Sequence, residues 1–585
     1  MSPHIRRRTL LGGLAAAGIG GIGIAAGANA VPGKKKAAEP DFGPNVSVFG
    51  PDTPIAEIQA RLDDVFGKQE EAQFGDGRYA VLFKPGTYDG VDASIGFYTH
   101  IAGLGLSPDD VTVKGAVHAE ADWFDGNATQ NFWRCAENLC VEPKGGADRW
   151  AVSQAAPYRR MHVRGDLQLD DGGWSSGGLM ADTKVDGQVR SGSQQQWLSR
   201  NTDWGGWEGS NWNMVFVGAR NAPAGDFPSP PYTRVEKTPK VREKPFLYVD
   251  DAGDFAVFVP ALRTGSTGTS WDGGGRPEGE SLPVGDFLIA TPDTSADAMN
   301  EALGGGKHLL LTPGVYALGD TLKVTRAGTV VLGLGLATLV PAAGKAAMTV
   351  ADVDGVKLAG FLVDAGEGGS PTLMEVGAEG ADGDHAADPT SLHDVFFRIG
   401  GPHAAQATRS LVVHSNHVIG DHTWLWRGDH GDGIGWETNP ADTGLVVHGD
   451  DVTFYGLFAE HYQKYQVEWN GERGRTYFFQ NEMPYDPPDQ GSWMNGDTRG
   501  FAAYKVADGV RDHEAWGMGS YCFFNVNPDV AADRAFEVPE AAGVKLHHMV
   551  AVSLGGTGTI AHVVNGTGGP ADKGNQVAYL TEYGG

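Results

Sequence analysis

The chain has 585 residues, more than one compact domain of ordinary size contains, so we expect two large domains. Its formal net charge of −28 at pH 7 opposes binding to nucleic acid and to other anionic polymers, which leaves a neutral ligand as the better partner. Glycine occupies 87 positions without a collagen repeat, and glycine in that quantity is typical of many short strands joined by turns.

The N-terminus has the features of an export signal. Three arginines at 6–8 precede an apolar Gly/Ala run, and the Ala-Asn-Ala sequence at 28–30 offers a cleavage site. This order predicts a secretory signal peptide over residues 1–30, and the arginine run favours the twin-arginine route. The apolar run is too short and too rich in glycine to remain as a membrane anchor. We therefore expect a secreted protein without membrane attachment, whose mature chain begins with a flexible segment at 31–48.

A series of short elements occurs twice in the chain. Residues 54–66 match an amphipathic helix, and the β-prone stretch after it contains Pro-Gly-x-Tyr at 85–88 and Gly-Leu-Gly-Leu at 103–106. A second helix, at 294–303, is followed by the same two motifs, which lie 228 and 230 residues after the first copies. This agreement predicts an internal duplication. A helix in front of such strands would cover the open end of a parallel β-helix, where strand edges are otherwise unpaired.

Short β-prone runs broken by Gly, Asp and Asn continue to the C-terminus, and a 3.6-residue period persists only in the two helices. We therefore expect an all-β fold of two tandem right-handed parallel β-helix lobes of the pectin-lyase type, packed side by side, with short capping helices. The first lobe is predicted at 49–218 and the second at 291–585. Between them, residues 219–290 begin with a proline-rich, charged stretch that is typical of a surface linker, followed by apolar segments expected to form a bridging sheet.

Two glutamates stand in aromatic-rich, β-prone segments of the second lobe. Glu460 and Glu482 are 22 residues apart, which matches one coil of a parallel β-helix. On neighbouring coils their backbones would lie about 4.8 Å apart, and two carboxylates held so close do not both ionise freely. One of them would keep a proton toward neutral pH, and an acid beside a base is the equipment for cleaving a glycosidic bond. The alternative is that both are ordinary glutamates on solvent-facing coils.

The first lobe repeats this spacing with uncharged polar residues. Gln154 and Ser176 are also 22 residues apart, and a third coil carries Gln195 and Gln196. Two interpretations remain open: a polar ladder inside the β-helix, or a cleft wall that holds water and sugar hydroxyls. The 15 tryptophans leave a similar choice, because flat indole rings stack on sugars but also fill cores.

Histidine and aspartate crowd residues 414–432, but their spacing matches no standard zinc pattern, so neither a metal nor another cofactor is expected. Cys135 and Cys140 are close enough in sequence to form a disulfide, with a buried thiol pair as the alternative, and Cys522 has no obvious partner. The protein is expected to be a monomer.

Seven motifs together resemble one known family and are spread over most of the mature chain. They are WAVSQA (150–155), SSGG (175–178), GSQQQWLSRN (192–201), LHDVFFRIGG (392–401), HTWLWRGDH (422–430), YGLFAEHYQKYQ (455–466) and FQNEMPYDPP (479–488). These motifs are similar to those of the exo-β-1,3-glucanases, or laminarinases, of glycoside hydrolase family 55. The resemblance implies two tandem β-helices with a catalytic cleft between them, and a polysaccharide or oligosaccharide substrate.

By this resemblance, Glu482 corresponds to the general acid and Glu460 to the carboxylate that activates or places the water. Gln154 and Ser176 correspond to the residues that position this water from the other lobe. Hydrolysis with inversion is implied in the same way. Further contacts with the substrate are expected from seven residues: Gln195, Gln196, Trp204, Trp207, His461, Gln480 and Tyr485.

The chain departs from the family pattern in two places. Asn481 stands where family members have threonine before the catalytic glutamate, and the run after His461 is more polar than usual, which leaves the sugar specificity open. A polysaccharide lyase and a non-catalytic glycan-binding protein on the same fold are the alternatives. The lyase would need Ca²⁺ or basic side chains to neutralise a uronate, and a strongly acidic chain suits that poorly.

Overall fold

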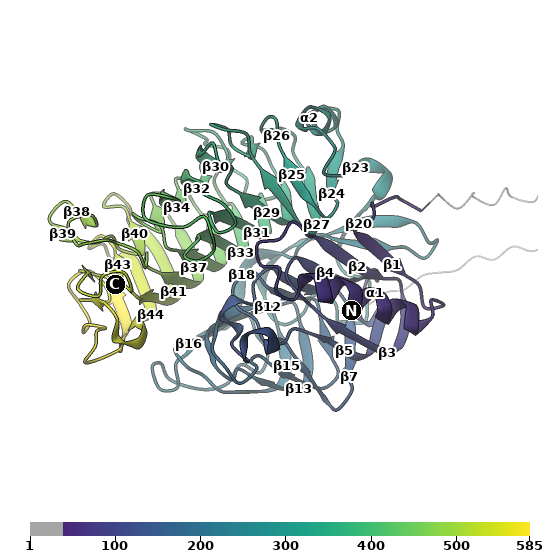
Figure 1. Ribbon diagram of the computed structural model, residues 1–585, viewed down its shortest axis with the longest axis horizontal. Coiled ribbons are helices and arrows are strands. Elements are labelled where there is room, and N and C mark those ends of the chain that lie inside the picture. Colours follow the sequence, from purple (N-terminus) through teal and green to yellow (C-terminus); the bar gives the residue numbers. More distant parts are fainter. Residues whose placement is uncertain (1–38, 585) are drawn as a thin grey trace, which may run out of the picture. The chain divides into compact units, whose positions relative to one another are not determined.

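Strands account for most of the regular structure in the computed structural model, which describes residues 39–584 (Figure 1). The predicted signal peptide at 1–30 lies outside these residues. Two α-helices are present in the described part, α1 (Ile55–Gln69) and α2 (Ala296–Gly304). Short 3-10 helices occur at Pro108–Asp110, Asp122–Phe124, Ala128–Gln130, Val284–Asp286 and Leu554–Gly556.

The first lobe is built from two parallel sheets. The nine-stranded sheet contains, in spatial order, β1 (Val46–Phe49), β2 (Tyr79–Phe83), β4 (Thr99–Gly103), β6 (Arg134–Glu137), β9 (Pro157–Arg159), β12 (Ser175–Ala181), β14 (Gln194–Arg200), β16 (Asn213–Val217) and β17 (Tyr232–Val235). The eight-stranded sheet contains β3 (Gly86–Ser94), β5 (Val111–His118), β7 (Cys140–Pro143), β10 (His162–Val163), β13 (Lys184–Arg190), β11 (Asp166–Gln168) and β8 (Ala147–Arg149), with β15 (Asp203–Glu208) paired to β13.

The second lobe repeats this design with longer strands. Its twelve-stranded sheet contains β23 (Phe287–Ala290), β24 (His308–Leu311), β27 (Val330–Val340), β29 (Lys357–Asp364), β31 (Ser391–Ile399), β33 (Ile419–Arg427), β35 (Thr453–Glu460), β37 (Gly474–Glu482), β41 (Asp512–Cys522), β44 (Gly543–Ser553) and β46 (Val577–Gly584), with β25 (Val315–Ala317) paired to β27. The eight-stranded sheet contains β26 (Leu322–Val324), β28 (Met348–Val350), β30 (Ser370–Val376), β32 (Ala407–Val413), β34 (Ala441–Val447), β36 (Val467–Trp469), β40 (Tyr504–Val506) and β43 (Phe536–Glu537). Only the last pairing of the larger sheet, between β44 and β46, is antiparallel. The predicted fold of two tandem parallel β-helix lobes is confirmed.

The segment between the lobes folds onto both of them. It forms an antiparallel pair of β18 (Thr238–Arg242) with β21 (Leu262–Ser266), and a three-stranded antiparallel sheet of β19 (Phe246–Val249), β20 (Phe255–Pro260) and β22 (Gly279–Pro283). Small pairs near the C-terminus join β38 (Met494–Asn495) to β39 (Thr498–Arg499) and β42 (Ala531–Ala532) to β45 (Thr559–Ile560).

The strand ladders extend past the predicted domain boundaries. β1 takes residues from the stretch predicted to be flexible, β17 continues the first ladder beyond residue 218, and β23 opens the second before residue 291. The charged stretch is also not confined to the surface, because Glu243 and Lys244 are buried in ion pairs. The predicted surface linker therefore stays at the surface over most of residues 219–240 and is buried from residue 241 to residue 248.

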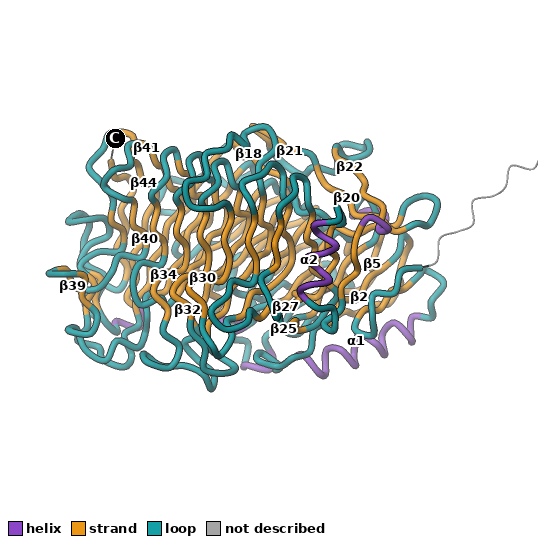
Figure 2. Tube along the Cα trace, turned by 90° about the horizontal axis from the view of Figure 1, so that it is seen from above, coloured by secondary structure: helices purple, strands orange, loops and turns teal. Residues whose placement is uncertain are grey.

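The two helices close one end of each lobe (Figure 2). Ile58 and Leu62 of α1 are buried among the first strands of lobe one, and Met299 and Leu303 of α2 are buried among the first strands of lobe two. Ser295 caps α2 by accepting a hydrogen bond from the Ala298 amide. Both caps thus bury an apolar helix stripe over strands whose edge would otherwise be open.

The lobes meet through the outer faces of their larger sheets. Side chains of both lobes share an apolar cluster, with Leu179 and Leu198 from the first lobe against Tyr455 and Phe458 from the second. Burying apolar surface on both faces of these sheets explains why their strands read as nearly continuous apolar runs rather than alternating ones.

Charged groups cross the same boundary. Arg159 donates to Asp394 and Asp421, and Arg200 donates to Asp421 and Glu243, with all of these side chains buried. Buried ions of opposite sign in such contact fix the register of one lobe on the other, because an unpaired partner would be costly.

Candidate active site

Glu460 and Glu482 are the last residues of the adjacent strands β35 and β37, and they are direct partners in the parallel register. The predicted placement on neighbouring coils is confirmed. Burial raises the pKa of both carboxyls, and for Glu460 the charge of Glu482 adds to the increase. Two buried carboxyls at this spacing hold a proton between them toward neutral pH.

Each oxygen of Glu460 accepts one hydrogen bond from a buried N–H group. Gln154 Nε2 donates to Oε1 over 2.8 Å, and Trp424 Nε1 donates to Oε2 over 2.7 Å. Such donors favour the ionised carboxylate and fix its plane. Gln154 comes from the first lobe and Trp424 from β33 of the second, so both lobes orient this group. Trp424 was not predicted, because a tryptophan inside a buried apolar strand has the pattern of a core residue.

Glu482 has a different environment, made of hydroxyl and imidazole groups. The Tyr485 hydroxyl donates to its Oε2, and Nε2 of His461 lies 3.7 Å from the same oxygen. His461 Nδ1 lies 3.1 Å from the Met483 carbonyl oxygen, so Nδ1 carries a proton and Nε2 faces Glu482. Among the described residues Glu482 has no counterpart to the two N–H donors of Glu460.

Asp429 and His430 add a carboxyl and an imidazole in contact with each other at this place. Asp429 Oδ1 is 2.8 Å from His430 Nδ1 and 3.8 Å from His461 Nε2. Burial opposes ionisation of Asp429, but the neighbouring imidazoles outweigh it and lower the pKa of this carboxyl. Gln73, which follows α1, lies 2.5 Å from His430 Nε2 through its amide nitrogen. Asp429 and His430 belong to the His/Asp-rich run at 414–432, for which the sequence predicted no function.

These groups line a cavity of about 250 Å³ that residues of both lobes enclose. Of the residues predicted from the sequence, the cavity contains Gln154, Ser176, Gln195, Glu460, His461, Glu482 and Tyr485. The remaining lining residues are Thr129, Gln130, Phe132, Trp426, Asp429, His430, Phe523 and Leu554. Acid, amide, hydroxyl and imidazole groups therefore converge on a space with aromatic walls.

Trp204 and Trp207 do not line this cavity, so the structure does not bring these two predicted residues to the pair of glutamates. Both belong to β15, where Trp204 is buried in the first-lobe core and Trp207 packs against Phe216. The reason is topological: β15 belongs to the eight-stranded sheet, whereas the strands that face the second lobe belong to the nine-stranded one. Spacing along the chain did not distinguish the two sheets.

Gln196 and Gln480 are buried beside the cavity and do not line it, which corrects a second prediction. Gln196 contacts the Tyr521 hydroxyl through Oε1 and donates to the Gly517 carbonyl over 3.3 Å. Gln480 donates to the carbonyl of Ser176 over 2.8 Å. Both amides cross the lobe boundary and hold the backbone that carries cavity residues.

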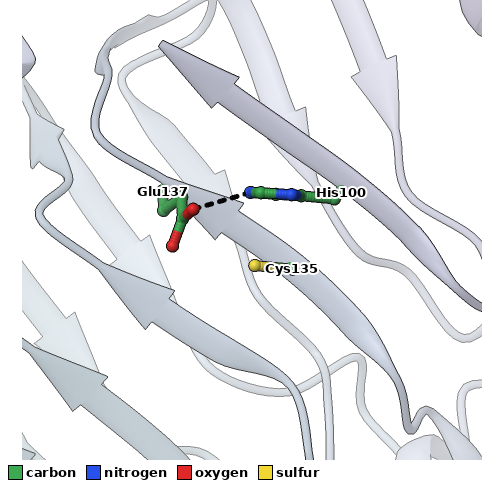
Figure 3. Close-up of side chains that lie close together, drawn as sticks. All are labelled: His100, Cys135 and Glu137. Carbon is green, nitrogen blue, oxygen red and sulfur yellow. Dashed lines mark ion pairs between the residues drawn. The ribbon is translucent and has the colours of Figure 1, made fainter. Parts of the chain in front are cut away.

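Three buried side chains in the first lobe have the composition of a metal site. The ligand atoms of His100, Cys135 and Glu137 lie within 4.8 Å of one another, and Figure 3 shows the His100 ring pointing at Glu137, 2.9 Å from Nε2 to Oε1. Lys244 Nζ, however, lies 2.7 Å from the other oxygen of Glu137. Burial also raises the pKa of the Cys135 thiol well above its usual range, so the sulfur is protonated. With an ammonium already in the position of a cation, this group is an ion-pair cluster.

The other residues considered for metal or disulfide chemistry have structural partners. Cys135 and Cys140 are free, buried thiols in different sheets, so the disulfide alternative is wrong. In the His/Asp-rich run, Asp421 pairs with arginines of the first lobe, His422 with Asp394, and His414 stacks on His448. The run therefore disperses over several contacts.

Comparisons with known proteins agree with this architecture. Residues 287–482 match the family model of the LAM55 pectate lyase-like domain. A curated exo-beta-1,3-glucanase from Streptomyces sp. (strain SirexAA-E / ActE) is 56% identical over 579 residues, which cover 97% of this chain and 95% of the relative. The structure of sacteLam55A from Streptomyces sp. SirexAA-E matches with a TM-score of 0.91 and 57% identity, covering 93% of this chain and 99% of that one. A variant of that protein in complex with glucose matches with the same TM-score and 56% identity.

Proposed function

This chain belongs to the LAM55 family of pectate-lyase-like proteins, and we propose from that premise that it is a glycoside hydrolase that cleaves β-1,3-glucan from the chain end. The observation that carries the proposal is the direct register of Glu460 with Glu482, together with Gln154 and Ser176 from the opposite lobe in the same cavity. The curated relative that covers nearly the whole chain is named an exo-beta-1,3-glucanase.

The proposed reaction uses the two carboxyls in different protonation states. Glu482, protonated, gives its proton to the leaving glycosidic oxygen as the bond to the anomeric carbon breaks. Glu460, whose ionised form is favoured by two N–H donors, takes a proton from water as the water oxygen bonds to the anomeric carbon. Gln154 and Ser176 hold that water from the first lobe. Inverting enzymes separate the two carboxyls by about 6.5–9.5 Å and retaining enzymes by about 5–5.5 Å, and inversion follows here from the family resemblance.

The shape and lining of the cavity support action on a neutral chain end. Its volume of about 250 Å³ falls below the range of about 300–1,000 Å³ for ligand pockets, which suits one terminal sugar unit better than an internal stretch of polymer. Phe132, Trp426 and Phe523 offer ring faces and edges to the apolar side of a sugar. The described lining residues include no lysine or arginine, so no basic side chain of this cavity would neutralise a uronate.

The test is hydrolysis of a panel of α- and β-glucans by the mature protein, with Glu482→Gln in parallel. We expect glucose release from β-1,3-glucan alone, with the anomer inverted in freshly formed product when followed by proton NMR. Glu482→Gln should lose turnover but still bind laminari-oligosaccharides. Wild-type turnover in this variant, or product oligomers from internal cleavage, would contradict the proposal.

We also propose that the protein is exported and acts as a monomer, on the basis of the N-terminal sequence and of a site completed within one chain. No helix within residues 39–584 has the length and apolar content needed to span a bilayer. Detection of the protein in culture medium and light scattering of the mature chain test these two points.

A further inference from the structure

A second cavity lies where the segment between the lobes meets the first lobe. Its volume is about 350 Å³, within the range of about 300–1,000 Å³ of small-molecule sites, and it shares no residue with the candidate active site. Arg160 and Arg220 of the first lobe form one wall, and residues between 258 and 278 form the other. A ligand here would bind independently of the acid and base.

Arginine side chains supply donors to this cavity that the fold does not use. Arg160 is occupied, because it donates to Asp182 and to neighbouring groups. Arg220 is 46% exposed and makes only long contacts of 3.5 Å to two aspartates. Arg263 donates through Nη2 to the Gly268 carbonyl over 3.2 Å. Its buried Nη1 lies 3.8 Å from Oε1 of Glu243, an ion-pair distance, but makes no hydrogen bond to any described residue. Arg220 and Arg263 therefore have free hydrogen-bonding capacity at the wall.

Acceptors stand beside these donors. Asp272 and Glu278 place carboxylates in the same lining. Thr269 is 6% exposed, and its hydroxyl has no hydrogen-bond partner within the described part of the chain. A buried polar group left without a partner costs about 1–3 kcal/mol, so groups of this kind mark places where a ligand or solvent completes the structure.

The apolar part of the lining is rigid. Trp271 is buried, and its indole nitrogen donates to the Asp182 carbonyl over 2.8 Å, which fixes the ring. Phe258 and Pro260, both from β20, lie in the same wall. Fixed apolar surfaces of this sort are complementary to the C–H faces of a sugar ring.

We propose that this cavity is a second, non-catalytic site for a short stretch of neutral glucan. The identity of the glucan rests on the proposed function. Sugar hydroxyls both donate and accept hydrogen bonds, so a wall with free guanidinium donors and carboxylate acceptors matches them. Charges of both signs are balanced here. Arg160, Arg220, Arg263 and Arg276 line the cavity with Asp272 and Glu278, and two further carboxylates, Asp182 and Glu243, pair with Arg160 and Arg263. Neither a small anion nor a cation therefore meets an uncompensated charge of opposite sign. The mixed lining therefore favours an uncharged, polyhydroxylated ligand, which the site would hold while a chain end is cleaved elsewhere.

The test is calorimetric titration of the full-length mature Glu482→Gln protein with a β-1,3-linked glucose oligomer. We expect two binding events. Arg220→Met combined with Arg263→Met should weaken one of them by about tenfold or more, in keeping with hydrogen bonds to charged groups, and leave the other. Arg473→Met is the matched control. Arg473 has a similar exposure of 47% and pairs with Asp450, which does not line this cavity, so this variant should retain both binding events.

A single binding event in the Glu482→Gln protein would overturn the proposal, and so would two unchanged events in the double arginine variant. Binding of inorganic sulfate that depends on Arg220 and Arg263, without glucan binding, would replace it with an anion site. Glucan hydrolysis by the wild type is measured separately and reports only on the proposed function. If the double variant does not fold, the same titration is made with Arg220→Met alone, at an exposed position, and one of the two binding events should again be weakened.

Discussion

The two lobes begin with the same elements but present opposite chemistry to each other. Toward the boundary the first lobe offers N–H donors on Gln154, Arg159 and Arg200. The second lobe answers with the carboxylates of Glu460 and Asp421. A duplicated scaffold has thus become two halves that are complementary rather than equivalent, and neither half alone contains the candidate site.

Among the predictions for the two sides of this boundary, Glu460→Gln in the second lobe should lower activity the most. The substitution keeps the shape but removes the base, so we expect kcat to fall by about 10²–10⁴-fold with little change in oligosaccharide binding. The measurement is turnover on laminari-oligosaccharide, with calorimetry for binding.

An aryl β-glucoside with a good leaving group distinguishes the role of Glu482 as acid from that of Glu460 as base. Such a substrate needs little protonation, so it should partly restore activity to Glu482→Gln but not to Glu460→Gln. Equal recovery in both variants would refute the assignment of acid and base.

Among the first-lobe donors that contact the second lobe outside the cavity, Arg159 should matter most for stability. Arg159→Met is therefore expected to lower thermal stability the most. It removes one of the cations that compensate the buried carboxylates of Asp394 and Asp421, and loss of one member of a buried pair costs about 3–5 kcal/mol. Thermal unfolding of the mature protein should shift clearly to lower temperature, whereas Arg164→Met, a partly exposed arginine, should shift it little.

The same ion pairs predict how stability depends on pH. Burial opposes ionisation of Asp394, but Arg159 and Lys244 outweigh it and lower the pKa of this carboxyl. Its folded pKa lies below the unfolded value of about 3.9, so its contribution is present above that value and is lost as pH falls toward the folded pKa. Acid unfolding followed by tryptophan fluorescence should therefore begin at higher pH in Arg159→Met. A midpoint equal to that of the wild type would show that the pair does not set acid stability.

Gln154→Leu should have an intermediate effect on activity. It removes the first-lobe donor to Glu460 without changing any charge, and a hydrogen bond to a charged group is worth about 1.5–3 kcal/mol. We expect kcat to fall by about 10–150-fold at the pH of maximal wild-type activity. Gln195→Leu, in the same cavity but without a hydrogen bond to Glu460, is the matched control and should raise KM more than it lowers kcat.

Trp424→Phe should have the smallest effect and the most specific signature. Loss of the indole N–H removes one donor that favours ionised Glu460, so the pKa of this carboxyl rises and the acidic limb of the kcat profile moves to higher pH. A uniform loss of activity at every pH would point instead to a packing defect.

Much of the fold was accessible from residue patterns because a β-helix is periodic. The helix, Pro-Gly-x-Tyr and Gly-Leu-Gly-Leu motifs identified both lobes, since the same series opens each of them. The 22-residue step also placed Glu460 opposite Glu482, because one coil returns the chain to the same face of the sheet.

Local patterns failed where two different surfaces share one composition. Trp204 and Trp207 have the aromatic character of sugar-binding residues but lie in the sheet that faces away from the second lobe. Trp424 has the character of a core residue but donates to the candidate base.

The sequence by itself therefore determined the coil, its repeat and the pairing of the two glutamates, all of which depend on contacts between neighbouring turns. Only the tertiary structure decided which outer faces meet and which donors reach Glu460. These depend on burial and on contacts such as that of Gln154 with Glu460, which join residues 306 positions apart and leave no local pattern.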